Sequence, residues 1–212
     1  MEILREWNQE NQKDSWNSRY EDELYIEGYE KIAGVDESGR GSLAGPLVAA
    51  AVILDKNKLM IEEIDDSKKL SAGKRELIFK KIIKSCLCWS VVKISPEKID
   101  SFSVTRANEI AFKEAVNGLK IKPDIVLADF INTDPGDKYL RIVKGDSISV
   151  SIAAASIIAK VIRDRIMLKL ARKYPEYGFE HNKGYGTKKH LMSLQKYGPT
   201  EVHRLSYRGV LN

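Results

Sequence analysis

The chain has 212 residues, of which 43% are hydrophobic and 31% are charged. This length and balance predict a globular protein with one main domain and a buried core, and they exclude a disordered chain. The 35 lysines and arginines exceed the 30 acids, and the net charge of +5 permits a polyanionic partner without requiring one. The polar N-terminus lacks the apolar segment of a signal peptide, and no apolar run is long enough to cross a membrane, so we expect a cytoplasmic protein.

The number of cysteines argues against two further classes of protein, the disulfide-rich scaffold and the structural zinc protein. Two cysteines occur, Cys86 and Cys88, whereas a disulfide-rich scaffold uses more and a structural zinc site needs about four ligands. We therefore expect two reduced thiols. The three histidines, His181, His190 and His203, are expected at the surface or at helix caps and not at a metal.

The predicted elements alternate between strands and helices. Residues 1–30 are expected to be a helical N-terminal extension with aromatic residues that can dock it on the rest of the molecule. In chain order, the elements that follow are strands at 31–36 and 46–54, a helix at 71–85, a strand at 88–94, a helix at 105–119, strands at 124–129 and 139–143, and helices at 151–172 and 187–196. A glycine-rich turn joins the first two strands as a hairpin, and another turn is expected at 134–137. This mixture favours an α/β layered domain.

Four acids end or follow three of the predicted strands. They are Asp36, Glu37, Asp129 and Asp146. If these strands neighbour one another in one sheet, the carboxylates converge at one edge, where they repel each other unless a cation is bound. Oxygen ligands suit Mg²⁺ or Mn²⁺ rather than Zn²⁺, and a pair of such ions can promote phosphodiester hydrolysis. The alternative is that these are ordinary solvated acids in loops.

Two glycine-containing segments add to this pattern. Gly39-Arg40-Gly41 comes directly after the first two acids, where its backbone can approach a sugar hydroxyl and its arginine can neutralise a phosphate. The segment 181–187 places Tyr185 between two glycines, where the ring can stack on a base or a ribose. A simple tight turn and a mobile basic loop remain the alternatives.

Five blocks of the sequence resemble the bacterial and archaeal ribonuclease HII family, and they keep the family's order. The blocks are IAGVDESGRGSLAGP at 32–46, DSKKLS at 66–71, KGDSISVSIAAASIIAKVIRD at 144–164, KGYGT at 183–187 and HR at 203–204. The sequence departs from the family pattern at Phe130 and at 103–108.

The resemblance implies a ribonuclease H-like fold over residues 31–212, with a central mixed β-sheet flanked by helices and a C-terminal helical part. It implies catalytic and metal-binding roles for Asp36, Glu37, Asp129 and Asp146. It implies that the divalent metal is Mg²⁺ or Mn²⁺, with two ions when substrate is present. It implies that the substrate-binding residues are Gly39, Arg40, Gly41 and Tyr185, which recognise the ribonucleotide and its junction with DNA.

The resemblance also implies an activity. The protein would cut the RNA strand of RNA/DNA hybrids, and single ribonucleotides in duplex DNA on their 5′ side, leaving 3′-hydroxyl and 5′-phosphate ends. We expect a monomer with nucleic-acid partners, no membrane and no obligate protein partner. One rival is another two-metal nuclease of the same fold class, such as a DNA-junction resolvase. The other rival is a non-enzymatic hybrid- or DNA-binding module, although such a module has no need for acids that repel its ligand.

Overall fold

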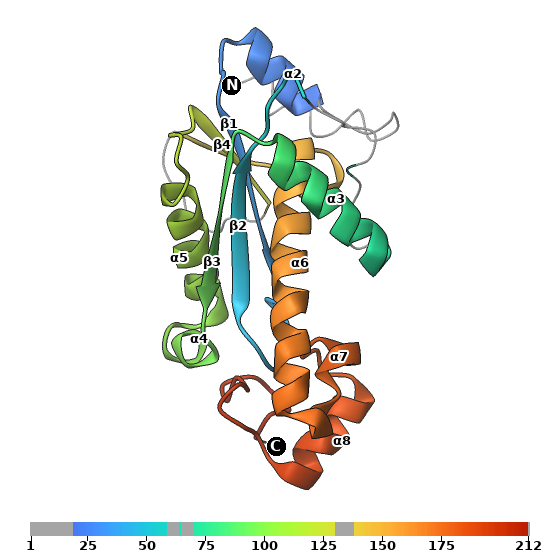
Figure 1. The fold of residues 1–212 in the computed structure, drawn as a ribbon. Helices are drawn as coiled ribbons and strands as arrows, with labels where there is room; N and C mark the ends of the chain where they lie inside the picture. Colours follow the sequence, from blue (N-terminus) through green and yellow to red (C-terminus); the bar gives the residue numbers. More distant parts are fainter. Residues whose placement is uncertain (1–18, 59–63, 65–69, 130–137, 212) are drawn as a thin grey trace.

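The structure is a computed structural model that describes residues 19–58, 64, 70–129 and 138–211. A five-stranded mixed sheet carries helices on both faces, and a group of short helices lies beyond one end of it (Figure 1). The predicted turn at 134–137, Phe130 and most of the 66–71 block lie outside the described residues.

Every strand and helix predicted between residues 31 and 197 is present, with ends that differ from the predicted ends by no more than two residues. The strands are β1 (Ile32–Ser38), β2 (Leu47–Ile53), β3 (Cys88–Ile94), β4 (Ile125–Ala128) and β5 (Tyr139–Arg141). The helices are α2 (Arg19–Ile26), α3 (Ala72–Ser85), α4 (Pro96–Phe102), α5 (Val104–Asn117), η3 (Gly145–Ser147), α6 (Val150–Lys173), η4 (Pro175–Tyr177), α7 (Phe179–Asn182) and α8 (Lys188–Tyr197). Of these, α4, α7, η3 and η4 were not predicted.

The sheet has the order β3-β2-β1-β4-β5. The predicted hairpin is confirmed, because β1 pairs antiparallel with β2, and β2 pairs antiparallel with β3. In contrast, β4 is parallel to both β1 and β5. Val35 lies opposite Ala128 in the parallel pair, so the residues that follow them, Asp36 and Asp129, come to the same edge of the sheet.

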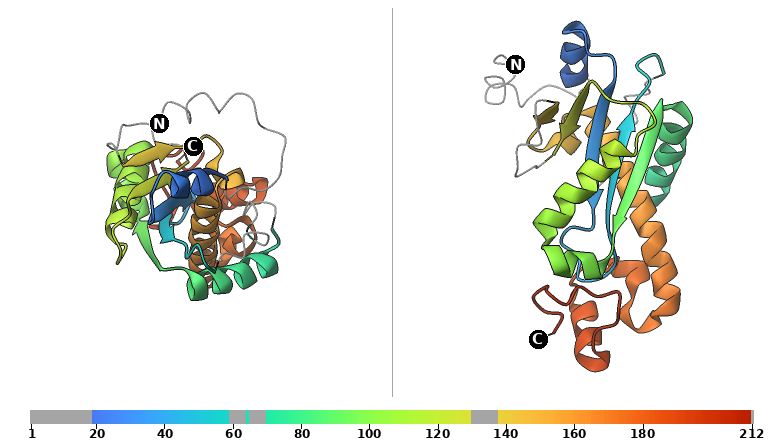
Figure 2. Two further views of the ribbon diagram at one scale, coloured as in Figure 1. Left: turned by 90° about the horizontal axis from the view of Figure 1, so that it is seen from above. Right: turned by 90° about the vertical axis from the view of Figure 1, so that its left-hand side faces the viewer.

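Each face of the sheet is covered by different helices. Side chains alternate between the faces of a strand, so neighbouring residues of β2 belong to different cores. Ala49 packs in a cluster with Phe112 of α5, whereas Ala50 packs in a second cluster with Ile158 of α6. The view from above shows the sheet between α5 on one side and α3 with α6 on the other (Figure 2).

The long helix α6 lies unusually close to β1. A Cβ atom added to Gly34 would overlap the backbone of Ser151, so only glycine allows this approach. The helix begins one residue before the predicted Ser151, because the Ser149 side chain accepts a hydrogen bond from Ile152 N and forms the N-cap. Close packing of α6 on β1 brings the middle of this helix to the end of the strand, where the acids lie.

The described part of the N-terminal extension, α2, packs at the opposite end of the molecule from the C-terminal helices (Figure 1). Its Tyr20 and Leu24 are buried in one cluster with Ile125 of β4 and Ile152 of α6. None of the described helices combines the length and the apolar character needed to cross a membrane.

Candidate active site

One cleft, with a volume of about 490 Å³, brings together all of the site residues predicted from the sequence. Its lining includes the four acids Asp36, Glu37, Asp129 and Asp146, the turn residues Gly39, Arg40 and Gly41, and Tyr185. Ser38, Ser156 and Lys160 also line it, although the sequence analysis did not single them out. The cleft therefore joins the end of the sheet, the middle of α6 and the C-terminal part of the chain.

Asp36 and Glu37 are held on opposite faces of β1. Glu37 lies opposite Ala49 and so points toward α5, where Asn108 donates a side-chain hydrogen bond to it. Asp36 lies opposite Ala50 and points toward α6. Asn108 is only 5% exposed, and a polar residue on the buried face of a predicted helix is the signal that could have identified it.

Asp146 is positioned differently from the prediction. It does not follow directly on a strand, because β5 ends at Arg141 and Asp146 lies in the short helix η3. Lys144 enters this helix with a left-handed backbone (φ 57°), and a Cβ on Gly145 would overlap the Ile152 side chain. Asp146 itself is buried, so η3 fixes the carboxylate against the start of α6.

Repulsion and burial dominate the electrostatics of the acids. Burial raises the pKa of Asp36 well above its usual value, and the negative charges of Glu37, Asp146 and Asp129 raise it further. Burial also raises the pKa of Glu37, although the charge of Arg40 and the hydrogen bond from Asn108 oppose this shift. A cation bound in the cleft would relieve these costs.

The donor set fits a hard divalent cation, because every acidic group on the cleft wall offers carboxylate oxygens. Within the described residues, no three acids, histidines or cysteines are already gathered at metal-binding distance. The four carboxylates line the cleft, and a side-chain hydrogen bond between Asp36 and Glu37 brings two of them together.

The glycine turn is supported from beneath by a buried arginine. Gly39 has φ 92°, and a Cβ there would overlap the guanidinium of Arg163. Arg163, which is fully buried, donates to Pro46 O (3.1 Å), Ala44 O (3.1 Å) and the Ser42 hydroxyl (2.7 Å). Burial lowers its pKa to about 10. This residue was not predicted from the sequence, because arginine is seldom fully buried.

A second buried arginine holds the other side of the turn. Arg204 donates to Gly45 O through Nε (3.1 Å) and Nη2 (2.9 Å), and to Arg40 O through Nη1 (2.9 Å). The Tyr207 hydroxyl also donates to Arg40 O at 2.7 Å. These bonds hold the carbonyl of Arg40, while Gly41 has open space around it.

The loop that carries Tyr185 packs against the same segment. Gly184 O accepts hydrogen bonds from Leu43 N (2.8 Å) and Ala44 N (3.2 Å). The Tyr185 ring is 39% exposed on the cleft wall, with its centroid 5.4 Å from the guanidinium carbon of Arg163. Tyr185 and the glycine turn are therefore parts of one surface, although they are distant in the sequence.

The prediction for two of the histidines is wrong. His190 and His203 are buried rather than at the surface, and their Nε2 atoms lie 3.1 Å apart. They are stable there because backbone and side-chain partners satisfy their ring nitrogens. His181 is exposed, as expected.

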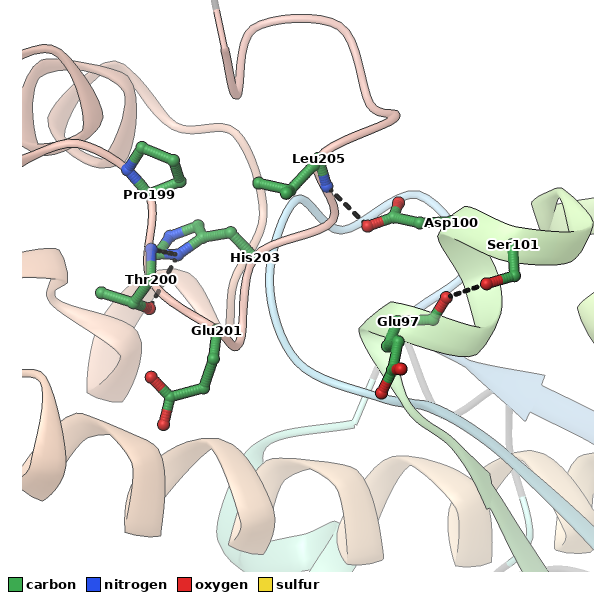
Figure 3. A pocket seen from close by; sticks show the side chains of 8 residues that line it. All are labelled: Glu97, Asp100, Ser101, Pro199, Thr200, Glu201, His203 and Leu205. Atoms are coloured by element: carbon green, nitrogen blue, oxygen red, sulfur yellow. Dashed lines mark hydrogen bonds between the residues drawn. The ribbon is translucent and has the colours of Figure 1, made fainter.

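A second cleft, of about 540 Å³, separates α4 from the C-terminal segment (Figure 3). Its Asp100 accepts hydrogen bonds from Leu205 N (2.8 Å) and Ser206 N (3.0 Å), and its Glu201 pairs with Lys173. These acids are engaged in joining parts of the fold, which favours the first cleft as the active site.

Comparisons with known proteins agree with this fold. A solved structure of ribonuclease H2 from Pyrococcus horikoshii OT3 is 31% identical with a TM-score of 0.73, and the match covers 85% of this chain and 95% of that one. Ribonuclease HII from Archaeoglobus fulgidus, solved in a complex with PCNA, is 30% identical with a TM-score of 0.74, and the match covers 84% and 96%. The fold is therefore ribonuclease H-like, as predicted, and it defines the class as ribonuclease H endonucleases, hydrolases that act on RNA/DNA hybrids.

The sequence comparisons narrow this class. The family model described as Ribonuclease HII matches residues 33–210. Ribonuclease HII from Caldicellulosiruptor bescii is 50% identical over 188 residues, which are 88% of this chain and 91% of the relative. The chain belongs to the ribonuclease HII family.

Proposed function

We propose that this ribonuclease H depends on a divalent metal and also cuts duplex DNA at a single embedded ribonucleotide. The cut falls on the 5′ side of the ribonucleotide and leaves 3′-hydroxyl and 5′-phosphate ends. The observation that carries the proposal is the convergence of four carboxylates, the glycine turn and Tyr185 on one cleft. Such a cut would begin the removal of ribonucleotides from DNA during replication and repair.

The proposed catalytic and metal-binding residues are Asp36, Glu37, Asp129 and Asp146. Their oxygen donors favour Mg²⁺ or Mn²⁺, and two ions are proposed when a substrate phosphate adds further ligands. When bound, the metal supplies charge neutralisation for the phosphate and lowers the pKa of the attacking water. Because burial and mutual repulsion raise the pKa of Asp36, metal binding at neutral pH would be coupled to the loss of any proton that this group retains.

The protein's own groups would orient the substrate. Asp36 and Glu37 would hold the metal at the end of β1, because without a cation these carboxylates would repel the reacting phosphate. Arg40 sits at the cleft wall, where its charge can meet a neighbouring phosphate. Lys160 lines the same cleft and is paired with Asp164 at 2.8 Å, so it adds positive charge close to the acids.

Selectivity for the ribonucleotide is assigned to the turn and the tyrosine. The 2′-hydroxyl is the group that separates RNA from DNA. The backbone at Gly41 is open to solvent and can approach that hydroxyl, because no neighbouring atom lies where a side chain would be. Tyr185 would pack on the adjacent sugar, which couples recognition of the ribonucleotide to its DNA neighbour.

The test uses a labelled DNA duplex with one ribonucleotide, a continuous RNA/DNA hybrid and an all-DNA duplex, each with Mg²⁺, Mn²⁺ or chelator. We expect one metal-dependent cut 5′ to the ribonucleotide, cutting of the hybrid, and an intact DNA control. Cutting of the hybrid alone would remove the role proposed for the turn and Tyr185. Cutting of all-DNA duplexes would favour a resolvase, and tight binding without cutting would favour a binding module.

The proposal also covers assembly and location. We propose a monomer that acts in the cytoplasm without an obligate protein partner. The two cysteines are unpaired, which is the usual state in a reducing compartment. Light scattering during gel filtration, with and without a duplex substrate, should give the mass of one chain per complex; a dimer would contradict the monomer.

A further inference from the structure

Beneath Tyr185, the two buried histidines are linked end to end. His190 Nε2 lies 3.1 Å from His203 Nε2. At the outer ends, His190 Nδ1 lies 3.0 Å from Tyr185 O, and His203 Nδ1 lies 3.0 Å from Thr200 N. The chain of contacts thus runs from the backbone at Thr200 through two imidazoles to the backbone of Tyr185.

The partners at both ends determine where the protons lie. Tyr185 O is a carbonyl and can only accept, so His190 carries its proton on Nδ1. His203 Nδ1 lies 3.0 Å from both the backbone amide and the hydroxyl of Thr200. The hydroxyl can donate or accept, but the amide can only donate, so Nδ1 of His203 is unprotonated. The remaining proton of His203 is then on Nε2, and it is donated to the unprotonated Nε2 of His190.

This arrangement requires both rings to be neutral. A proton on His190 Nε2 would face the N–H of His203, and a proton on His203 Nδ1 would face the N–H of Thr200. Burial lowers the pKa of His203 to about 4, and the neighbouring His190 contributes to that shift. Burial also lowers the pKa of His190. The titratable ring packed against the pair is Tyr177, whose centroid lies 4.8 Å from that of His203 at an interplanar angle of 54°, and Phe179 covers another side.

The relay ends on the segment proposed to read the substrate. Tyr185 O accepts from His190 Nδ1 and also from Thr187 N at 2.8 Å, so both lone pairs are engaged and the peptide is held in one orientation. His203 is followed directly by Arg204, which holds the carbonyl of Arg40 in the glycine turn. One short segment therefore supports both halves of the recognition surface.

We infer that His190 and His203 are positioning residues, which form a directional and uncharged hydrogen-bond relay that sets the orientation of Tyr185 for ribonucleotide recognition. The inference rests on the proposed function for the role of Tyr185. The relay itself rests only on the hydrogen-bond partners of the two rings. The two can therefore be tested separately.

The relay is tested first without activity, by ¹⁵N NMR of the histidine rings in the wild-type protein at neutral pH. We expect the Nδ1-protonated tautomer for His190 and the Nε2-protonated tautomer for His203, with the exposed His181 as the internal reference. The opposite tautomers, or a charged ring in the pair, would overturn the relay whatever the enzyme does.

The positioning role is tested with His190→Phe in wild-type and Tyr185→Ala backgrounds. We expect His190→Phe to lower kcat/KM on the single-ribonucleotide duplex by at least about tenfold relative to the continuous hybrid. In the Tyr185→Ala background the same change should add almost nothing, because the two residues act through one element. Additive losses, or unchanged selectivity in His190→Phe, would overturn the positioning role.

Two milder variants distinguish loss of the relay from a general folding defect. His203→Gln keeps a donor at the Nε2 position, and His190→Asn keeps a donor at the Nδ1 position, so both should retain more selectivity than the phenylalanine variants at the same positions. If His203→Gln and His203→Phe lost the same amount of selectivity, while both kept the circular dichroism spectrum of the wild type, the relay would be contradicted. If wild-type protein fails to cut at single ribonucleotides, the proposed function fails, while the NMR result still decides the relay.

Discussion

Glu21 of α2 accepts a hydrogen bond of 2.6 Å from the hydroxyl of Ser149, the residue that caps α6. The same carboxylate oxygen accepts from Ser151 N at 2.9 Å. Glu21 is 1% exposed, and its other oxygen has no hydrogen-bond partner among the described residues. A helix that precedes the region matched by the family model thus supplies a carboxylate to the N-terminus of the helix behind the active site.

Replacement of Glu21 by alanine should destabilise the protein by about 1–3 kcal/mol, because the buried Ser149 hydroxyl and Ser151 amide lose their acceptor. Glu21→Gln is the matched control, since its amide oxygen can still accept both bonds. Urea unfolding at neutral pH measures the difference. Identical midpoints for the wild type and Glu21→Ala would show that α2 does not stabilise α6.

Asp36→Asn should abolish cleavage while the protein remains folded.

Because the pKa of Asp36 is raised in the fold, its contribution to stability is fully present below the unfolded pKa and is lost as pH rises through the folded pKa. Metal-free Asp36→Asn should therefore gain stability relative to the wild type as pH rises, and melting curves across a pH series in chelator measure this. If the melting temperatures of the two proteins changed with pH in parallel, Asp36 would not be a buried carboxylate that its neighbours repel.

The same variant tests metal binding. Mn²⁺ at saturating concentration should raise the melting temperature of the wild type, because a ligand that binds only the folded state stabilises it. Asp36→Asn should show little or no rise, and chelator should reverse the effect in the wild type. An equal rise in both proteins would place the metal elsewhere.

Substitutions at two glycines should distinguish an effect on folding from an effect on ribonucleotide recognition. Gly34→Ala should cost roughly 3 kcal/mol or more, because the new methyl group would overlap the backbone of Ser151 and neither β1 nor α6 can move freely. Gly41→Ala has open space and should leave the melting temperature unchanged, while it reduces cutting at a single ribonucleotide. Thermal unfolding and the cleavage assay are run on both variants. A stable Gly34→Ala protein would mean that α6 packs less closely than described.

Cys86 should be a poor nucleophile. Burial, with a smaller contribution from Cys88, raises the pKa of the Cys86 thiol to about 11, so little thiolate exists near pH 8. Alkylation by iodoacetamide, followed by mass spectrometry, should be slow in the native protein and fast in urea. Native labelling as fast as that of a free thiol would contradict this.

Much of the fold was predictable because its signals are local. The helices predicted to begin at Ser71 and Thr187 do begin there, because each hydroxyl is an N-cap that accepts a hydrogen bond from a backbone amide of the first turn. The fully buried strand β2 was predicted from a continuous apolar run. The acids and the glycine turn were predicted from their spacing within ordered blocks, which is a property of the sequence itself.

By itself, then, the sequence predicted the main strands and helices, and it predicted the four acids and the glycine turn that the cleft brings together. Only the tertiary structure decided which polar residues are buried and what they contact. Nothing local distinguishes His190 and His203 from exposed His181, or Arg163 from a surface arginine. Burial of a polar group depends on whether distant segments bring it a hydrogen-bond partner, and such partners are fixed only when the whole chain packs.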